Sequence, residues 1–514
     1  MKKSLLLLGT LSFFACSYAQ NRIEKSGTPV NKDDTPIFSS FIGSDNTSFY
    51  TLRIDKNIGG LYQGKCSIDK ISKTNLTYVD RIASTSHDTR TDDFPTPIMI
   101  KDKIFLVLKF NNKSNKTCDY ILDVISTNSS NKTPERRVLI SFPTDQSAWY
   151  QSAFRYSISP DSSKIAVVAK YKDDLTFYLY NAADFKEISN KKITNIGDKL
   201  YNSNFMRMNF KIDNEGNLFY SHIEGPTFSV NHISAGNNNV SSCSFKVNPS
   251  YDMGDINYLI DSKNNQLYVH SIFYEKNSNP KIKGYNSVGI FIAKVDKKSM
   301  KASMEKYYPF TSDIVDRITC GKSEKGINSE RSYSSEIILT GNSEILFEAE
   351  QNSSALVNRG LNAGSMYDMS TKVYLSANEL IVAKLGSNLD LMWMKEIPRS
   401  NTYTGITNTT ESTIAFSKMF NNEKLKYYYI EHPKYEETHI DYLTVNTCAT
   451  PDTKSYPGTN VVEYSLDKTG KIEKRIIFTN KNEWLIPVFY KLDGKNLVRF
   501  RDGNKEYFSI INLN

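Results

Sequence analysis

The chain has 514 residues, of which 64 are Lys or Arg and 56 are Asp or Glu, and it carries a formal net charge of +8. Hydrophobic residues make up 39% of the chain and charged residues 23%, which excludes a disordered protein, a collagen-like fibre, a small disulfide-stapled domain and a polytopic membrane protein. The length is sufficient for one large domain or about three ordinary ones. What remains is a soluble globular protein rich in β-forming residues.

The first twenty residues have the features of a secretory signal peptide. Lys2 and Lys3 form a positively charged start, and residues 5–15 form an apolar stretch that is too short to span a bilayer. Small residues stand at both positions that a signal peptidase inspects, which predicts cleavage between Ala19 and Gln20.

These features predict that residues 1–19 are a signal peptide and that residues 20–514 form one exported domain, either periplasmic or secreted. The alternative is a lipoprotein anchored at Cys16. After the leader, no apolar run is long enough for a transmembrane segment. Five further cysteines are widely separated and form no C-x-x-C pair, so a cysteine zinc site is excluded and the disulfide pairing stays open. They are Cys66, Cys118, Cys243, Cys320 and Cys448.

The positive charge could indicate a nucleic-acid partner, but its distribution argues against one. Loss of Lys2 and Lys3 with the leader would lower the net charge from +8 to +6. The remaining basic residues are interleaved with acidic ones along the whole chain, whereas nucleic-acid sites concentrate Lys and Arg on one face or in one run. The densest basic run, residues 294–301, is typical of an exposed sheet edge, where lysines prevent edge-to-edge pairing.

A short strand, a polar turn and a second strand recur along the chain. In the clearest copy, residues 156–168, Pro160 and Asp161 form a tight turn between two alternating strands. A second hairpin follows each copy, so the repeating unit has four antiparallel strands and roughly 40 to 50 residues, which is the size of a propeller blade. Further copies of the first hairpin occur at 41–50, 99–107, 210–220, 258–269, 338–347 and 490–498.

The segment Ser159-Pro160-Asp161-Ser162-Ser163-Lys164-Ile165-Ala166 resembles the blade repeats of bacterial exported β-propellers, notably those of the Tol-system type. The resemblance is specific at this one blade and extends as a weak pattern over most of the chain. It implies a fold and no chemistry.

The repeats predict an all-β protein, a single β-propeller of about eight four-stranded blades, with seven blades as the second choice and an array of β-sandwiches as the alternative fold. A three-strand remainder at 484–514 lacks an outer strand. We expect residues 22–30 to supply it by pairing with residues 507–511, which would close the ring through its N- and C-terminal strands. The other predicted blades span 36–85, 96–143, 153–195, 205–248, 256–310, 335–398 and 402–478.

Long insertions distinguish the later blades. Blade six carries one at residues 352–379, blade seven a longer one at about 421–459, and a long connector runs from 311 to 333. Loops of this length are often functional. The blade-seven insertion holds a dense cluster of aromatic and titratable residues, which could be a solvated loop, a surface that stacks on a sugar or peptide, or a divalent metal site. The candidate ligand surface consists of Tyr427, Tyr429, His432, Tyr435, Glu436 and His439.

Tests for known chemistry are negative. No G-x-S-x-G nucleophile motif and no H-E-x-x-H motif occurs. The acidic run at 87–93 lacks the glycine that a calcium loop needs. The sequence therefore assigns no catalytic, cofactor-binding or metal-binding residue. Paired carboxylates that meet at the centre of a ring leave no sequence motif, so acid–base catalysis stays open.

Three functions are compatible with this sequence. The first is a non-catalytic, exported binding propeller, monomeric, that presents loops and a funnel to an unknown protein, peptide or glycan. The second is a carbohydrate-active enzyme that uses carboxylates in the funnel. The third is a structural component of a surface or secretion assembly. Nucleic acid is not an expected partner of any of them.

Overall fold

The computed structural model describes residues 38–511 apart from 56–62, 89–95, 113, 129–132, 144–151, 172–173, 195–208, 225–226, 237–238, 277–284, 319–331, 358–371, 398–400, 407–416, 422–423, 432–458, 481–483, 494 and 503–504. These residues form eight antiparallel sheets that follow one another along the chain. Seven sheets have at least four strands, and the last has three. The predicted all-β propeller with eight blades is therefore confirmed.

The first four blades each contain four consecutive strands. Blade one contains β1 (Phe38–Ser44), β2 (Ser48–Asp55), β3 (Gln63–Ser72) and β4 (Tyr78–Asp88). Blade two contains β5 (Thr96–Ile100), β6 (Lys103–Asn112), β7 (Thr117–Ser126) and β8 (Glu135–Pro143). Blade three contains β9 (Ser152–Ile158), β10 (Lys164–Tyr171), β11 (Asp174–Asn181) and β12 (Glu187–Ile193). Blade four contains β13 (Phe210–Ile212), β14 (Leu218–Glu224), β15 (Thr227–Ile233) and β16 (Val240–Lys246).

The later blades are less regular. Blade five contains β17 (Tyr251–Met253), β18 (Asn257–Asp261), β19 (Gln266–Lys276), β20 (Tyr285–Asp296) and β21 (Lys301–Pro309). Blade six contains β22 (Ser332–Leu339), β23 (Ile345–Val357), β24 (Lys372–Leu385), β25 (Leu391–Ile397) and β26 (Asn401–Ile406). Blade seven contains β27 (Ser417–Asn421), β28 (Lys424–Glu431), β29 (Thr459–Leu466) and β30 (Ile472–Asn480). Blade eight contains β31 (Trp484–Leu492), β32 (Lys495–Asp502) and β33 (Lys505–Ile511).

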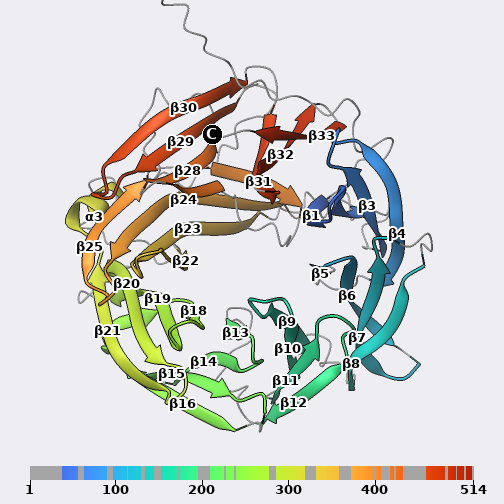
Figure 1. Ribbon diagram of the computed structural model, residues 1–514, viewed down its shortest axis with the longest axis horizontal. Coiled ribbons are helices and arrows are strands. Elements are labelled where there is room, and N and C mark those ends of the chain that lie inside the picture. The colour runs from blue at the N-terminus through green and yellow to red at the C-terminus, as the bar shows by residue number, and fades with distance from the viewer. Residues whose placement is uncertain are drawn as a thin grey trace, which may run out of the picture.

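The blades surround a ring axis (Figure 1). In each blade the first strand lies nearest this axis and the last strand of the four-strand path lies at the perimeter. The inner strands of neighbouring blades touch in series, from β9 to β13, β18 and β22. Among the described residues one helix is present, α3 (Ser312–Ile318), and it is neither long nor apolar enough to cross a membrane.

Short turns explain why the repeat is visible in the sequence. The Asp161 carboxylate accepts a hydrogen bond from the Ser163 backbone N–H at 3.0 Å, and Asp467 accepts one from Thr469 N–H at 2.8 Å. Each aspartate thereby satisfies a backbone group that the turn leaves without a strand partner. Gly216 has a φ of +92°, which a residue with a Cβ rarely adopts.

The antiparallel order places the loops on two distinct faces of the ring. Turns from first to second strand and from third to fourth strand lie on one face, which we call the turn face. Connections from second to third strand and between blades lie on the other, which we call the loop face. The strand ends that flank residues 319–331, 358–371 and 432–458 all belong to the loop face.

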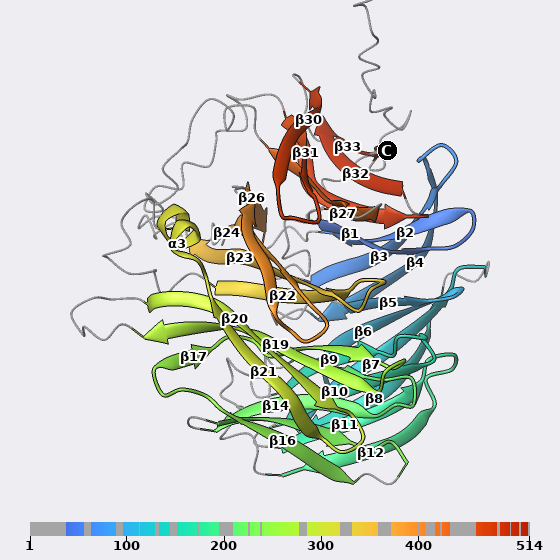
Figure 2. The same ribbon diagram turned by 60° about the vertical axis from the view of Figure 1, so that its left-hand side comes forward.

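Blade six differs from the prediction in its insertion and in its C-terminal limit. Much of the insertion predicted at 352–379 is strand, because β23 and β24 stay paired as far as Val357 and Lys372. The first half of β24 pairs with β26, so residues 401–406 belong to blade six and not to blade seven. Figure 2 shows β26 beside β24. Hydrogen bonding along a continuous long hairpin thus outweighs the polar composition that suggested a loop.

Apolar clusters join successive blades. Between blades four and five, Phe228 and Phe245 meet Phe291 edge-on, with ring centroids 5.3 and 5.8 Å apart. Cys66 and Cys118 are buried in the core of their blades, where cysteine packs as a small apolar residue.

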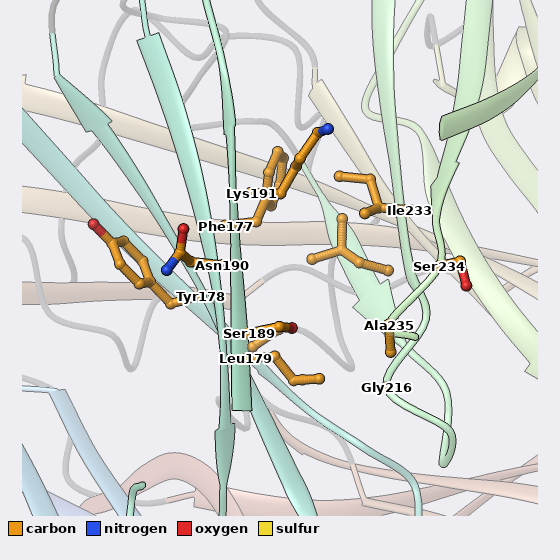
Figure 3. Close-up of a pocket in the computed structure, with 12 residues that line it drawn as sticks. Phe177, Tyr178, Leu179, Ser189, Asn190, Lys191, Gly216, Ile233, Ser234 and Ala235 are labelled. Atoms are coloured by element: carbon orange, nitrogen blue, oxygen red, sulfur yellow. The ribbon is translucent and has the colours of Figure 1, made fainter. Parts of the chain in front are cut away.

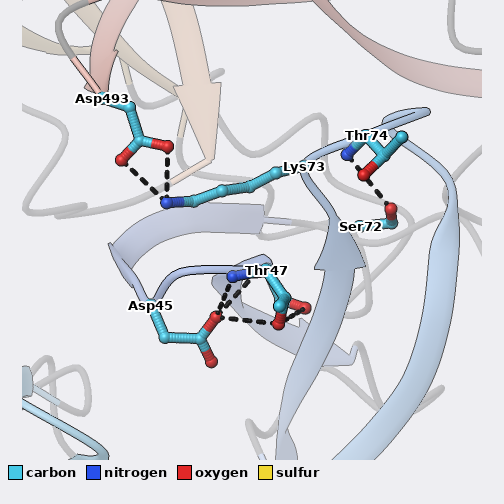
Figure 4. Close-up of polar contacts among 7 residues, drawn as sticks. Asp45, Thr47, Ser72, Lys73, Thr74 and Asp493 are labelled. Carbon is cyan, nitrogen blue, oxygen red and sulfur yellow. Dashed lines mark hydrogen bonds and ion pairs between the residues drawn. The ribbon is translucent and has the colours of Figure 1, made fainter.

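Blade eight packs against blade one and completes the ring. Phe508 of β33 and Phe49 of β2 form an edge-to-face pair with centroids 5.1 Å apart. On the turn face, Lys73 Nζ donates to both carboxylate oxygens of Asp493, at 2.8 and 2.7 Å (Figure 4). The outer strand predicted from residues 22–30 lies outside the described residues, so its pairing with β33 stays a prediction.

Candidate functional site

The predicted ligand surface on blade seven divides into a buried part and a part that the structure does not describe. Tyr427 and Tyr429 lie in β28 and have 0% exposure, within the apolar cluster between blades six and seven. Both faces of β28 are covered, so these two rings cannot stack on a ligand, and their inclusion in the surface is wrong. His432, Tyr435, Glu436 and His439 lie outside the described residues, as do Ala19 and Gln20.

A row of polar side chains instead follows the inner strands of blades four to seven. It begins just before β13, continues at the start of β18, reaches the middle of β22 and ends on β27. Figure 1 shows β13, β18 and β22 in succession around the ring axis. We call this set the inner-edge row. It consists of Asn209, Asn257, Ser335, Glu336 and Lys418.

Hydrogen bonds connect the first three members across three blades. Asn209 Nδ2 donates to Asn257 Oδ1 at 2.5 Å, and Asn257 Nδ2 donates to Ser335 Oγ at 3.2 Å. The three side chains are partly buried and belong to strands that are far apart in the sequence. The bonds fix the relative positions of blades four, five and six at the ring axis.

Ser335 also meets a histidine, which raises the possibility of a nucleophile and a base. Ser335 Oγ and His270 Nδ1 share a hydrogen bond of 3.1 Å. Burial lowers the pKa of His270 to about 3, and the positive charge of Lys211 adds to the shift. The imidazole is therefore neutral but a very weak base, and a general base works best with a pKa near the working pH. The pair suits hydrogen bonding better than nucleophilic catalysis.

The other end of the row is charged. Lys418 Nζ lies 2.8 Å from Glu336 Oε2 and 2.8 Å from Glu348 Oε2. Glu348 is buried and also accepts a 2.6 Å hydrogen bond from the Tyr427 hydroxyl. Burial raises the pKa of Glu348, although Lys418 and Tyr427 oppose the shift. Burial would lower the pKa of Lys418, but the two carboxylates raise it above its ordinary value. Tyr427 thus supports this cluster from inside the core.

The row lies along the middle of the inner edge of the ring. Asn257 of β18 pairs with His270 in the interior of β19, and β17 continues the inner edge of that blade toward the loop face. Lys418 of β27 pairs with Tyr427, an interior position of β28. The row therefore borders the ring axis between the two faces.

A second candidate is a groove between blades three and four (Figure 3). It is a shallow, open groove lined mainly by apolar side chains, including Phe177, Leu179 and Ile233, with Lys191 beside them. The apolar residues belong to the cluster that joins these two blades. The groove is thus an open continuation of the core, without the converging polar groups that give a ligand site its specificity.

Two buried carboxylates on blade six test the enzymatic alternative. Glu396 lies in β25, and the charge of nearby Glu379 acts on it. Burial raises the pKa of Glu396 to about 7, while its ion pair with Arg317 of α3 works against the shift. A raised pKa is typical of a general acid. Both carboxylates are buried, however, and Glu396 lies on β25, the outer strand of the path β22-β23-β24-β25, where Arg317 of α3 pairs with it.

Sequence reasoning did not find the inner-edge row because its members share no motif. Asn257 and Ser335 are 78 positions apart, and each resembles an ordinary polar residue of a strand. No group of three or more His, Cys, Asp or Glu side chains within the described ranges could hold a metal ion.

Comparisons with known proteins agree with the architecture and go no further. No protein-family model and no curated protein matches the chain. Among solved structures, it is similar to the Dos1 propeller (8% identity, 94% of each chain covered, TM-score 0.38). It is also similar to the β-propeller domain of the Trilobed protease from Pyrococcus furiosus (10%, 90% of this chain and 100% of that one, 0.35) and to TolB from Acinetobacter baumannii (10%, 84% and 80%, 0.26). These values carry no functional inference, and the chain is a β-propeller on the strength of its own eight sheets.

Proposed function

We propose that the protein is an exported, non-catalytic binding propeller that holds its ligand against the inner-edge row. The observation that carries the proposal is the hydrogen-bonded series Asn209–Asn257–Ser335, which crosses the inner edges of three blades at the ring axis. Amide and hydroxyl groups in such a series can both donate and accept hydrogen bonds, as binding of a polar ligand requires. The weak basicity of His270 favours binding over hydrolysis.

A binding screen with matched variants tests this function. Purified protein is screened against glycan and peptide libraries, and the affinity of the best ligand is then measured for Asn257→Ala and for the control Asn128→Ala. Asn128 is an exposed asparagine in the turn after β7 on the turn face, so it controls for the loss of an amide. We expect Asn257→Ala to weaken binding about tenfold, since one hydrogen bond contributes about 1 kcal/mol or slightly more. Equal affinities of the two variants would place the ligand elsewhere.

The proposal includes the export of residues 20–514 as one domain after removal of residues 1–19. The Lys2–Lys3 start and the short apolar stretch support it. Mass spectrometry of the protein recovered from an exporting bacterial host should show a chain that begins at Gln20. A lipid-modified Cys16 would contradict this cleavage site and support the lipoprotein alternative.

A further inference from the structure

Accessible charges of opposite sign lie beside Asn209, at one end of the inner-edge row, and at Glu336, near its other end. Lys211 of β13, two residues after Asn209, is exposed, and no described acidic residue forms an ion pair with it. Glu336 of β22 has a side chain that is 66% exposed. The inner strand of blade five, with Asn257, lies between them. The accessible surface of the row is thus positive at blade four and negative at blade six.

Neighbouring groups strengthen the positive end. The charge of Lys211 acts on His270, and burial also keeps that imidazole neutral, so the histidine adds no charge. Arg155, on the inner strand β9, is partly buried, and burial lowers its pKa while the nearby Asp255 opposes the shift. Arg155 and Lys211 thus place two cations on the neighbouring inner strands β9 and β13.

At the negative end, around Glu336, acidic side chains outnumber basic ones. Glu336 and Glu348 share one cation, Lys418, at 2.8 Å each. Glu348 is 3% exposed and cannot reach a ligand, whereas Glu336 lies at the surface. A cationic group of a ligand could therefore approach Glu336 from the axis while Lys418 stays on Glu348.

The centre of the row offers neutral hydrogen-bonding groups. Asn257 uses one lone pair of Oδ1 for Asn209, and a side-chain carbonyl oxygen has two. Asn209 donates one of its two Nδ2 hydrogens in the same bond. Side-chain amides match the donor and acceptor pattern of a peptide group, so a peptide backbone could lie along this part of the row.

We propose that the ligand of the row is an extended peptide that carries one acidic and one basic side chain on either side of a short polar spacer. The acidic side chain lies toward Lys211, the basic one toward Glu336, and the spacer backbone contacts Asn209 and Asn257. A uniformly anionic ligand, such as an acidic glycan, would meet repulsion from Glu336, and a uniformly cationic one would meet repulsion from Lys211. This inference depends on the proposed function, because it assigns a ligand class to the same site.

The test uses peptides of equal length and three charge patterns: one acid and one base in either order, two acids, and two bases. An oligouronide serves as the acidic glycan. Affinities are measured by titration calorimetry for the wild type, Lys211→Glu, Glu336→Lys and the control Lys298→Glu. Lys298 is an exposed lysine in the β20–β21 turn on the turn face. The substituted side chains are all exposed, and circular dichroism verifies that each variant is folded.

We expect the wild type to bind the mixed peptide at least tenfold more tightly than either uniform peptide. Lys211→Glu should change the preference to the two-base peptide, Glu336→Lys should change it to the two-acid peptide, and Lys298→Glu should leave it unchanged. A preference for a uniform peptide or for the oligouronide, or a preference that the variants do not alter, overturns the inference.

The two proposals fail in distinguishable ways. If a uniform ligand binds best and Asn257→Ala weakens it, the row is the binding site and the mixed-charge inference alone is wrong. If Asn257→Ala has no effect on the best ligand, the row is not the site and both proposals are wrong.

Discussion

Closure of the ring depends on a small apolar cluster between blades eight and one, and Phe508→Ala tests its importance. Phe508 is 2% exposed and packs edge-to-face on Phe49, with ring centroids 5.1 Å apart. Removal of a buried phenylalanine ring costs about 3 to 5 kcal/mol of unfolding free energy, because transfer energy is lost and a cavity remains. We expect Phe508→Ala to lower the unfolding free energy by an amount in this range.

The neighbouring ion pair should matter much less. Lys73 and Asp493 are joined by two short contacts, but the Asp493 side chain is 62% exposed. Solvent screens such pairs, and their measured contribution is about 0 to 1 kcal/mol. Asp493→Asn should therefore lower the unfolding free energy by less than 1 kcal/mol. The apolar packing around Phe508 should therefore contribute more to ring closure than the Lys73–Asp493 ion pair.

The assay combines urea unfolding, followed by circular dichroism, with hydrogen exchange of backbone amides. Phe245→Ala is the matched control, because Phe245 is a buried phenylalanine in the cluster between blades four and five. Both variants should lose similar stability, but only Phe508→Ala should accelerate exchange in β33 and β2. A loss below 1 kcal/mol for Phe508→Ala, or the same exchange pattern in both variants, would refute the reasoning.

Three further predictions concern single features of the ring. Gly289→Ala should lower the unfolding free energy, measured by urea titration, by about 1 to 3 kcal/mol, because a Cβ at this position would overlap the Phe273 ring. The control Gly236→Ala should leave the unfolding free energy unchanged, since no atom lies within 4 Å of the added Cβ. Burial raises the pKa of Glu396 to about 7 in the folded protein, from 4.5 in the unfolded chain. The folded protein therefore binds this proton more tightly, and the unfolding free energy of the wild type should fall by about 3 kcal/mol relative to that of Glu396→Gln as the pH rises from 4 to 8. Urea titrations that show no pH-dependent difference between the two proteins would contradict this. Deletion of residues 20–33 should markedly lower the melting temperature if that segment supplies the outer strand of blade eight, and an unchanged melting temperature would exclude it.

The blades could be predicted because their signals are local. Asp161 and Asp467 cap turns within a few residues of themselves, and Gly216 adopts a left-handed conformation in its own turn. Such interactions depend on neighbouring positions in the sequence and repeat with each blade. The predicted limits of the blades are accordingly close to the observed ones, except around blade six, where β26 pairs with β24 instead of beginning the next blade.

The tyrosines of blade seven were misassigned for an equally physical reason. Tyr427, Tyr428 and Tyr429 are consecutive, and all three are fully buried in β28. β28 is a middle strand of its blade, with β27 on one side and β29 on the other, and both of its faces are covered, so its side chains do not alternate between core and solvent. Three consecutive aromatic residues in a predicted strand were the signal of burial that a surface interpretation overlooked.

The inner-edge row, in contrast, has no signal in the sequence because it exists only through the register between blades. Asn209 meets Asn257 only if blades four and five keep their relative positions. A buried ion pair, Lys297 Nζ to Asp213 Oδ2 at 3.0 Å, links these two blades on the turn face. This ion pair on the turn face thus helps to keep the register between blades on which the contacts of the inner-edge row depend. A ring of locally encoded turns can therefore support a site that no local sequence pattern describes.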